Sequence, residues 1–99
     1  MAEGYEPKLS NLHGERVTVT GTTTDTGTIA VSVGLKYAYE AYVITNVASA
    51  YDKRYLVTVD YYNSTNNTVT LRIRNISDHS AVGNTEVNFT ALIFGIIAE

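Results

Sequence analysis

The 99-residue sequence contains no cysteine, no tryptophan and only one proline. The absence of cysteine excludes a disulfide scaffold and a thiolate metal site, and it leaves the redox compartment undetermined. Seven basic residues oppose ten acidic ones, so the chain lacks the positive charge that marks proteins binding nucleic acid or anionic lipid. The longest apolar run, residues 91–98, falls far short of the roughly 20 residues of a membrane-spanning helix. We therefore expect no nucleic-acid partner and no membrane insertion.

Charge of either sign is also scarce, since only 17% of the residues are charged. Ser, Thr and Asn outnumber the charged residues, and Tyr is the commonest aromatic, with eight copies. Such a surface is typical of extracellular and virion β-proteins. The amino end lacks the basic start and apolar run of a secretion signal. We expect the protein to be made in a cytosol, or its leader to have been removed.

The closing segment, residues 85–99, has the most informative pattern in the sequence. Alternation places Val87, Phe89, Ala91 and Ile93 on one face and Leu92, Phe94 and Ile96 on the other. A segment that is apolar on both sides is typical of a strand that is covered twice. A domain of this size has one core, so the second face must meet another sheet or another copy of the chain. We predict that Leu92, Phe94 and Ile96 form an oligomer interface.

Turn residues divide the rest of the chain into short segments. Residues 1–14 hold Pro7 and two glycines and are interpreted as an irregular arm or linker, which leaves residues 15–99 as the domain. Residues 16–24 and 28–35 flank a three-residue loop that ends in Gly27, so we predict a hairpin. Its register would place Val19 opposite Val33 and Val17 opposite Leu35.

Three further strands are predicted before the closing one. Residues 37–48 read as a strand whose inward face is ambiguous, which a bulge near Glu40 would resolve. Residues 55–62 and 68–76 flank a five-residue loop and are predicted to pair with Val59 opposite Leu71. The same register puts Tyr61 inside, opposite Val69, and sets Asp60 diagonal to Arg72.

Six short strands with no helical period predict a single all-β domain. The expected architecture is an antiparallel six-stranded β-sandwich with a jelly-roll or H-type-lectin-like layout.

Candidate sites are few. His13 and His79 lie in separate predicted loops, with Asp52 and Asp78 as possible carboxylate companions, but solvated histidines are favoured over a metal site. No glycine-flanked serine and no cysteine offers a nucleophile, so no catalytic residue, cofactor or metal is assigned. Asp60, Tyr62, Arg72 and Arg74 are predicted to share one exposed face. Arginine forks bind carboxylates and tyrosine rings stack on sugars, so these four residues form the candidate binding patch.

The layout resembles small bacteriophage virion domains, especially the receptor-binding heads of tail fibres and tail tips. The resemblance is carried by GERVTVTG at residues 14–21, YLVTVDYY at 55–62, VTLRIRN at 69–75 and NTEVNFTALIFG at 84–95. The pattern is similar to the six-stranded sandwich of the H-type lectins. That resemblance implies a homotrimer which binds sugars in clefts between its protomers.

Three functional hypotheses follow. The first is a non-enzymatic phage virion component, structural or receptor-binding, that trimerises and contacts a host-surface glycan or another virion protein. The alternative is a monomeric carbohydrate-binding or adhesion module of a secreted bacterial protein, which would be extracellular. The third is a small hydrolase that would depend on Asp60 or His79.

Overall fold

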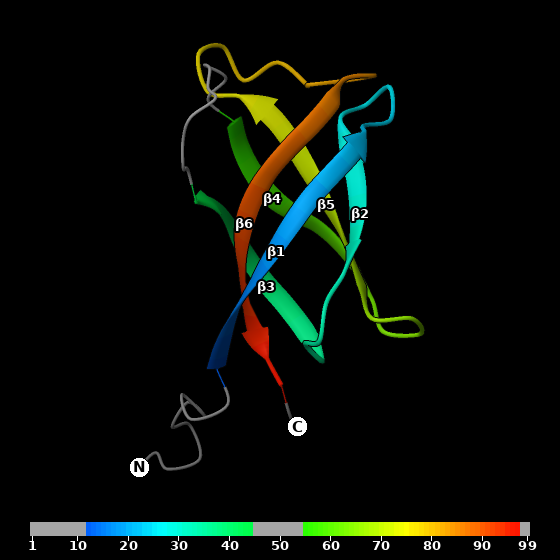
Figure 1. The fold of residues 1–99 in the computed structure, drawn as a ribbon, viewed down its shortest axis with the longest axis vertical. Helices are drawn as coiled ribbons and strands as arrows, with labels where there is room; N and C mark the ends of the chain where they lie inside the picture. The colour runs from blue at the N-terminus through cyan, green and yellow to red at the C-terminus, as the bar shows by residue number, and fades with distance from the viewer. Residues whose placement is uncertain (1–11, 45–54, 98–99) are drawn as a thin grey trace.

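Two three-stranded antiparallel sheets pack face to face in the computed structural model, which describes residues 12–44 and 55–97 (Figure 1). Sheet A has the strand order β1-β6-β3, and sheet B has the order β2-β5-β4. The strands are β1 (Leu12–Thr22), β2 (Thr28–Ser32), β3 (Tyr37–Ile44), β4 (Tyr55–Asn63), β5 (Thr68–Asn75) and β6 (Glu86–Ile96). The predicted all-β, six-stranded antiparallel sandwich is confirmed.

The chain changes sheet at every connection except the turn between β4 and β5. Strands that follow one another in sequence therefore face each other across the core in most cases. Residues 12–44 and 55–97 include no helix long and apolar enough to cross a membrane.

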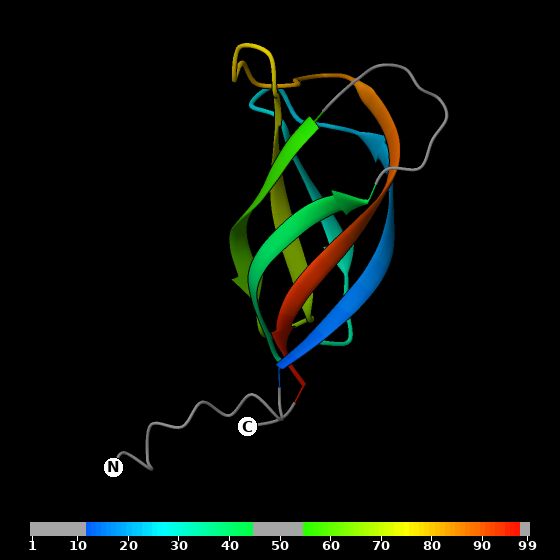
Figure 2. The same ribbon diagram turned by 90° about the vertical axis from the view of Figure 1, so that its left-hand side faces the viewer.

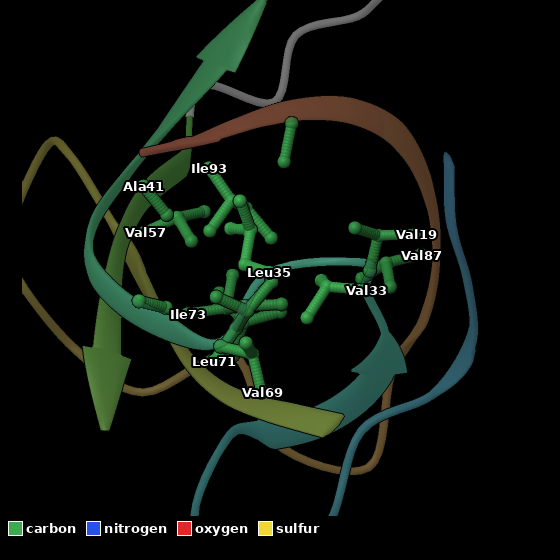
Figure 3. Close-up of a cluster of buried hydrophobic side chains, with 13 residues drawn as sticks. Val19, Val33, Leu35, Ala41, Val57, Val69, Leu71, Ile73, Val87 and Ile93 are labelled. Atoms are coloured by element: carbon green, nitrogen blue, oxygen red, sulfur yellow. The ribbon is translucent and has the colours of Figure 1, made fainter. Parts of the chain in front are cut away.

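The core lies between the two sheets and is built from aliphatic side chains of both (Figure 3). Small β-branched and aliphatic residues fill it because the two inner faces are only about 10 Å apart. The largest fully buried side chains are Leu35, Leu71, Ile73, Ile93, Val19 and Val69. Five of them lie at inward positions of strands, and Leu35 lies in the connection that leads into β3.

Strand β6 is the centre of sheet A, with β1 on one side and β3 on the other. Ala91 and Ile93 are fully buried, and Val87 is 3% exposed. Leu92, Phe94 and Ile96 point to the other side, where they remain partly exposed. The two-faced character predicted for the closing segment is confirmed, and its second face is not covered by sheet B.

The predicted β1–β2 hairpin is wrong beyond its turn. The turn itself forms, since the Thr24 amide donates to the Thr28 carbonyl at 2.9 Å and Gly27 has a positive φ of 84°. Past this point β1 pairs with β6 and β2 pairs with β5, so Val19 and Val33 meet across the core and not within a sheet. Alternation shows which face of a strand points inward, but it does not show which strand lies beside it.

The bulge predicted near Glu40 is confirmed. The β3–β6 register shifts between Ala38 and Glu40, which leaves Tyr39 as the extra residue. Ala38 and Ala41 then both point into the core, at 2% and 5% exposure. The bulge therefore resolves the ambiguous inward face of this strand.

The β4–β5 pairing differs from the prediction only near the turn. Val57 pairs with Ile73 and Val59 with Leu71, as predicted. A second bulge at Asp60 then shifts the register, so that Tyr61 lies opposite Thr70 and the turn is one residue shorter than predicted. Tyr61 is consequently 59% exposed, and its predicted place inside is wrong.

Several predicted boundaries change, and the strand predicted at residues 28–35 ends at Ser32. Strand β1 begins at Leu12, so the last three residues of the predicted arm belong to the strand. Strand β3 ends at Ile44, and the rest of the predicted segment, residues 45–48, lies outside the described residues, as do residues 1–11.

Thr23 fastens the β1–β2 turn to the loop before β6. It is 2% exposed, and its hydroxyl donates to the Val82 carbonyl at 2.6 Å and accepts the Thr85 amide at 3.0 Å. Its backbone amide also donates to the Thr85 carbonyl at 2.9 Å. These bonds hold the end of β1 beside the segment that leads into β6. Strand β1 therefore pairs with β6 and does not pair with β2.

We expect Thr23→Val to lower the free energy of unfolding by about 1–3 kcal/mol, because the buried Thr85 amide and Val82 carbonyl lose their partner. Chemical denaturation at one fixed protein concentration measures the change. Thr20→Val, at an exposed position of β1, is the matched control and should shift stability by less than about 0.5 kcal/mol. Equal effects of the two substitutions would contradict the role given to Thr23.

Candidate functional site

The outer surface of sheet A is the most unusual surface that the structure describes. The register sets Leu12, Ile96 and Tyr37 in one row, and Arg16, Leu92 and Tyr42 in another. Between these rows lies a third, formed by Gly14, Phe94 and Glu40, and beyond Leu92 a fourth is formed by Thr18, Thr90 and Ile44. We call this surface, made of these four rows, the A face.

Apolar side chains dominate the A face, and sheet B reaches it at one edge, where the Tyr62 ring of β4 meets the Tyr37 ring with 5.5 Å between centroids. Leu12 is 45% exposed, Tyr37 46% and Tyr42 51%. Single exposed apolar side chains are common in soluble proteins, but a contiguous group of them marks an interaction site. The A face also contains the three residues predicted as an oligomer interface, Leu92, Phe94 and Ile96.

Gly14 explains how Phe94 is held on this surface. A Cβ atom at Gly14 would lie 2.9 Å from Phe94 Cε1 and 3.3 Å from Leu92 Cδ1, so both side chains rest directly on the glycine backbone. On the other side, the Tyr42 ring meets Phe94 edge to face, with 6.0 Å between ring centroids. Phe94 is thereby held between the Gly14 backbone and the Tyr42 ring at the centre of sheet A.

Two charged side chains border this apolar centre on opposite strands. Arg16 projects from β1 and Glu40 from β3, and both are exposed. The Tyr42 hydroxyl donates a hydrogen bond to the Glu40 carboxylate. That hydrogen bond and the negative charge of Glu40 raise the pKa of Tyr42. The pair fixes the carboxylate beside the aromatic ring on the β3 side of the face.

The outer face of sheet B holds the predicted binding patch in a changed form. Arg72 and Asp60 form a salt bridge at 3.2 Å, as their diagonal placement predicted, and the Arg72 guanidinium also lies 3.4 Å from the Thr26 carbonyl. Arg74 lies on the same side of β5, two residues further along. The structure therefore brings together three of the four predicted residues.

Tyr62 does not join them. The bulge at Asp60 turns this side chain to the inner side, where its hydroxyl donates to the Leu35 carbonyl at 2.6 Å and accepts from Asn67 Nδ2 at 2.7 Å. Tyr61 takes its place on the outer face and was missed because alternation without a bulge puts it inside. We call Asp60, Tyr61, Arg72 and Arg74 the B patch.

The ion pair of the B patch is a weak contributor to stability. Its two side chains are 30% and 37% exposed, so water screens the attraction. Pairs of this kind contribute about 0–1 kcal/mol. The Arg72 guanidinium is largely used within the patch, because Nε and Nη2 donate to the Asp60 carboxylate and Nη1 donates to the Thr26 carbonyl.

A groove of about 620 Å³ runs between the neighbouring edges of β3 and β4, which Figure 2 shows side by side. Residues 39–43 form one wall and residues 55–59 the other. Tyr39, Tyr42 and Tyr55 contribute aromatic rings, and Glu40 contributes a carboxylate. Aromatic faces with a nearby acceptor are the chemistry that binds sugar rings.

The histidines do not form a site together. His13 lies at the start of β1 and His79 in the connection between β5 and β6, at opposite ends of the sandwich (Figure 1). Across residues 12–44 and 55–97, no group of three His, Cys, Asp or Glu side chains is arranged to hold a metal ion. Asp52, one of the proposed companions, lies outside the described residues.

The other companion, Asp78, belongs to a turn. Its carboxylate accepts hydrogen bonds from the Ser80 amide at 3.0 Å and the Ser80 hydroxyl at 2.7 Å, and these bonds lower the pKa of Asp78. His79 adopts a positive φ of 64° in the same turn. The carboxylate therefore stabilises this turn through local hydrogen bonds, as aspartate commonly does.

No family model, curated protein or solved structure matches this chain. The A face, the B patch and the β3–β4 groove are the three surfaces that the structure offers.

Proposed function

We propose that this chain is a non-enzymatic component of a bacteriophage virion that assembles through its A face. A homotrimer is favoured, and the B patch and the loops would contact a host-surface glycan or another virion protein. The protein would be made in the host cytoplasm and act in the virion. The phage assignment and the trimer come from the sequence resemblance to tail-fibre heads and H-type lectins.

The observation that carries the proposal is the exposed apolar centre of the A face. Leu92, Phe94 and Ile96 sit on the central strand of a sheet whose opposite side already covers the core. Burying apolar surface stabilises an assembly by about 25 cal/mol for each Å² removed from water. A three-stranded face with aromatic and aliphatic side chains can gain this energy only by packing against another surface.

The B patch supplies the second part of the proposal. Arg72 and Arg74 present guanidinium groups on the face opposite to the A face, with the exposed Tyr61 ring beside them. Planar guanidinium forks bind carboxylates in pairs of hydrogen bonds, and a tyrosine ring can stack on a sugar. An acidic glycan or an acidic surface of a neighbouring virion protein has the chemistry that this patch would recognise.

Size-exclusion chromatography with light scattering tests the assembly. We expect a particle of three times the 10.8 kDa chain mass at micromolar concentration. A strict monomer under those conditions would show that the A face is not an assembly surface and would contradict the proposal.

The alternative is a monomeric carbohydrate-binding or adhesion module of a secreted bacterial protein, and the tyrosine-lined β3–β4 groove favours it. A glycan array probed at concentrations where the chain is monomeric separates the two proposals. Binding that survives at those concentrations and is lost in Tyr39→Ala, which removes an exposed ring of the groove, supports the groove. Binding that appears only with the assembled particle supports the virion component.

A further inference from the structure

We infer that copies of this chain pack A face to A face around an axis parallel to β6, so that Arg16 of one copy meets the Glu40–Tyr42 pair of the next. This inference rests on the proposed assembly and specifies its geometry. The surface that covers the A face is then a second copy of the same chain.

The charges on the A face are opposite in sign and separated by the apolar centre. Within the four rows of the face, the charged side chains are Arg16 on β1 and Glu40 on β3. They lie on either side of β6, one row apart along the strands. One row is two residues, or about 7 Å along a strand, a distance that an extended arginine side chain covers.

Symmetry then separates the two ways of stacking one A face on another. A twofold axis parallel to β6 stacks the β1 side of one copy over the β3 side of its neighbour, and a threefold axis parallel to β6 sets the same two edges beside each other without stacking the faces. An axis lying across the strands carries β1 onto β1 and β3 onto β3. The first arrangement places Arg16 near the partner's Glu40, whereas the second brings like charges together and is destabilised by their repulsion.

The aromatic neighbour of Glu40 strengthens this choice. Tyr42 shares a row with Arg16, so a parallel axis sets the guanidinium over the partner's Tyr42. A guanidinium over a tyrosine face is favourable, more so where water is excluded. The hydrogen bond from the Tyr42 hydroxyl already orients the Glu40 carboxylate, so little freedom is lost when the arginine arrives.

The apolar centre is compatible with the same arrangement. Phe94 and Leu92 both rest on the Gly14 backbone, which keeps the apolar centre between the two charged edges close to the sheet. Two such surfaces can approach to about the 10 Å spacing of stacked sheets. At that spacing an extended Arg16 reaches across to the opposite surface.

Charge reversal tests the pairing. We expect Arg16→Glu and Glu40→Arg each to weaken self-association at least about tenfold, as measured by sedimentation equilibrium. The double variant Arg16→Glu with Glu40→Arg should recover most of the affinity, because the pair is re-formed with its signs exchanged. Asp25→Arg, an exposed residue of the β1–β2 turn, changes the net charge by the same amount as Glu40→Arg and should leave association unchanged. Circular dichroism of each variant checks that the sandwich is folded.

The outcomes distinguish this inference from the proposal beneath it. A monomeric wild-type chain would overturn both. An assembled wild type that tolerates both single reversals, or a double variant as weak as the singles, would overturn the parallel-axis pairing and leave the assembly proposal standing.

Discussion

Replacing Gly95 with alanine is expected to unfold the β3 end of sheet A and to lower the free energy of unfolding by about 4 kcal/mol or more. A Cβ atom at this position would overlap the Tyr37 carbonyl oxygen and would lie 2.9 Å from its carbon. Both are backbone atoms, so no side-chain rotation can relieve the overlap. The chain before the Ala38–Glu40 bulge must move off β6 if the substitution is made.

That contact fixes where β3 joins the sheet. The Lys36 amide donates to the Ile96 carbonyl at 2.6 Å, and the bulge follows immediately. Separating the two strands here would also expose Ala38 and Ala41, which belong to the core. A loss of 4 kcal/mol is a large share of the roughly 5–15 kcal/mol that stabilises a domain of this kind.

Thermal unfolding followed by circular dichroism measures the effect, with an expected fall in Tm of about 15–30 °C. Gly34→Ala is the matched control, since its Cβ would meet only the end of the Glu15 side chain, 3.3 Å away. We expect the control to lower Tm by less than about 8 °C. If Gly95→Ala matched the control, the close approach of Tyr37 to β6 would be contradicted.

The elements that depend on local pattern could be predicted from the sequence. Alternation identified six strands and both faces of the closing segment. In residues 37–48 both faces carry apolar side chains, and this ambiguity indicated the bulge near Glu40. The Val57–Ile73 and Val59–Leu71 pairs also follow from matching apolar positions on either side of a short turn. In each case the information lies within one short stretch of chain.

The pairing of β1 could not be predicted in the same way. Its inward residues Val17 and Val19 match the inward residues of β2 as well as they match Ala91 and Phe89 of β6. The deciding contacts are long-range, because Thr23 is fastened to Val82 and Thr85, about sixty residues later. Hydrophobic periodicity contains no information about such a partner.

The candidate patch shows how one residue alters a predicted site. The bulge at Asp60 leaves the Asp60–Arg72 salt bridge in place and exchanges Tyr62 for Tyr61 on the outer face. A bulge inserts one residue and so reverses every assignment between it and the next turn. Nothing in YLVTVDYY marks that position, because aspartate is compatible with both a regular strand and a bulge.

Adjacent residues of the closing strand allow its two faces to be tested separately, because one lies in the core and the next lies on the A face. Ile93 is fully buried between the sheets, whereas Leu92 lies partly exposed at the centre of the A face. We expect Ile93→Asp to unfold the domain, since an unpaired carboxylate in the core costs more than about 4 kcal/mol. Leu92→Asp should leave the sandwich folded and abolish self-association, because the carboxylate would be buried against the partner's apolar surface.

Circular dichroism and light scattering on both variants separate folding from assembly, and Leu92→Met serves as the control that keeps an apolar side chain at the interface. A folded monomer for Leu92→Asp, beside an assembled Leu92→Met, would show that the outer face of β6 functions between chains. An unfolded Leu92→Asp would instead place this residue in the core of its own subunit. A folded and fully assembled Leu92→Asp would contradict the A face as the contact, because charge introduced at its centre cannot be neutral when two such surfaces meet.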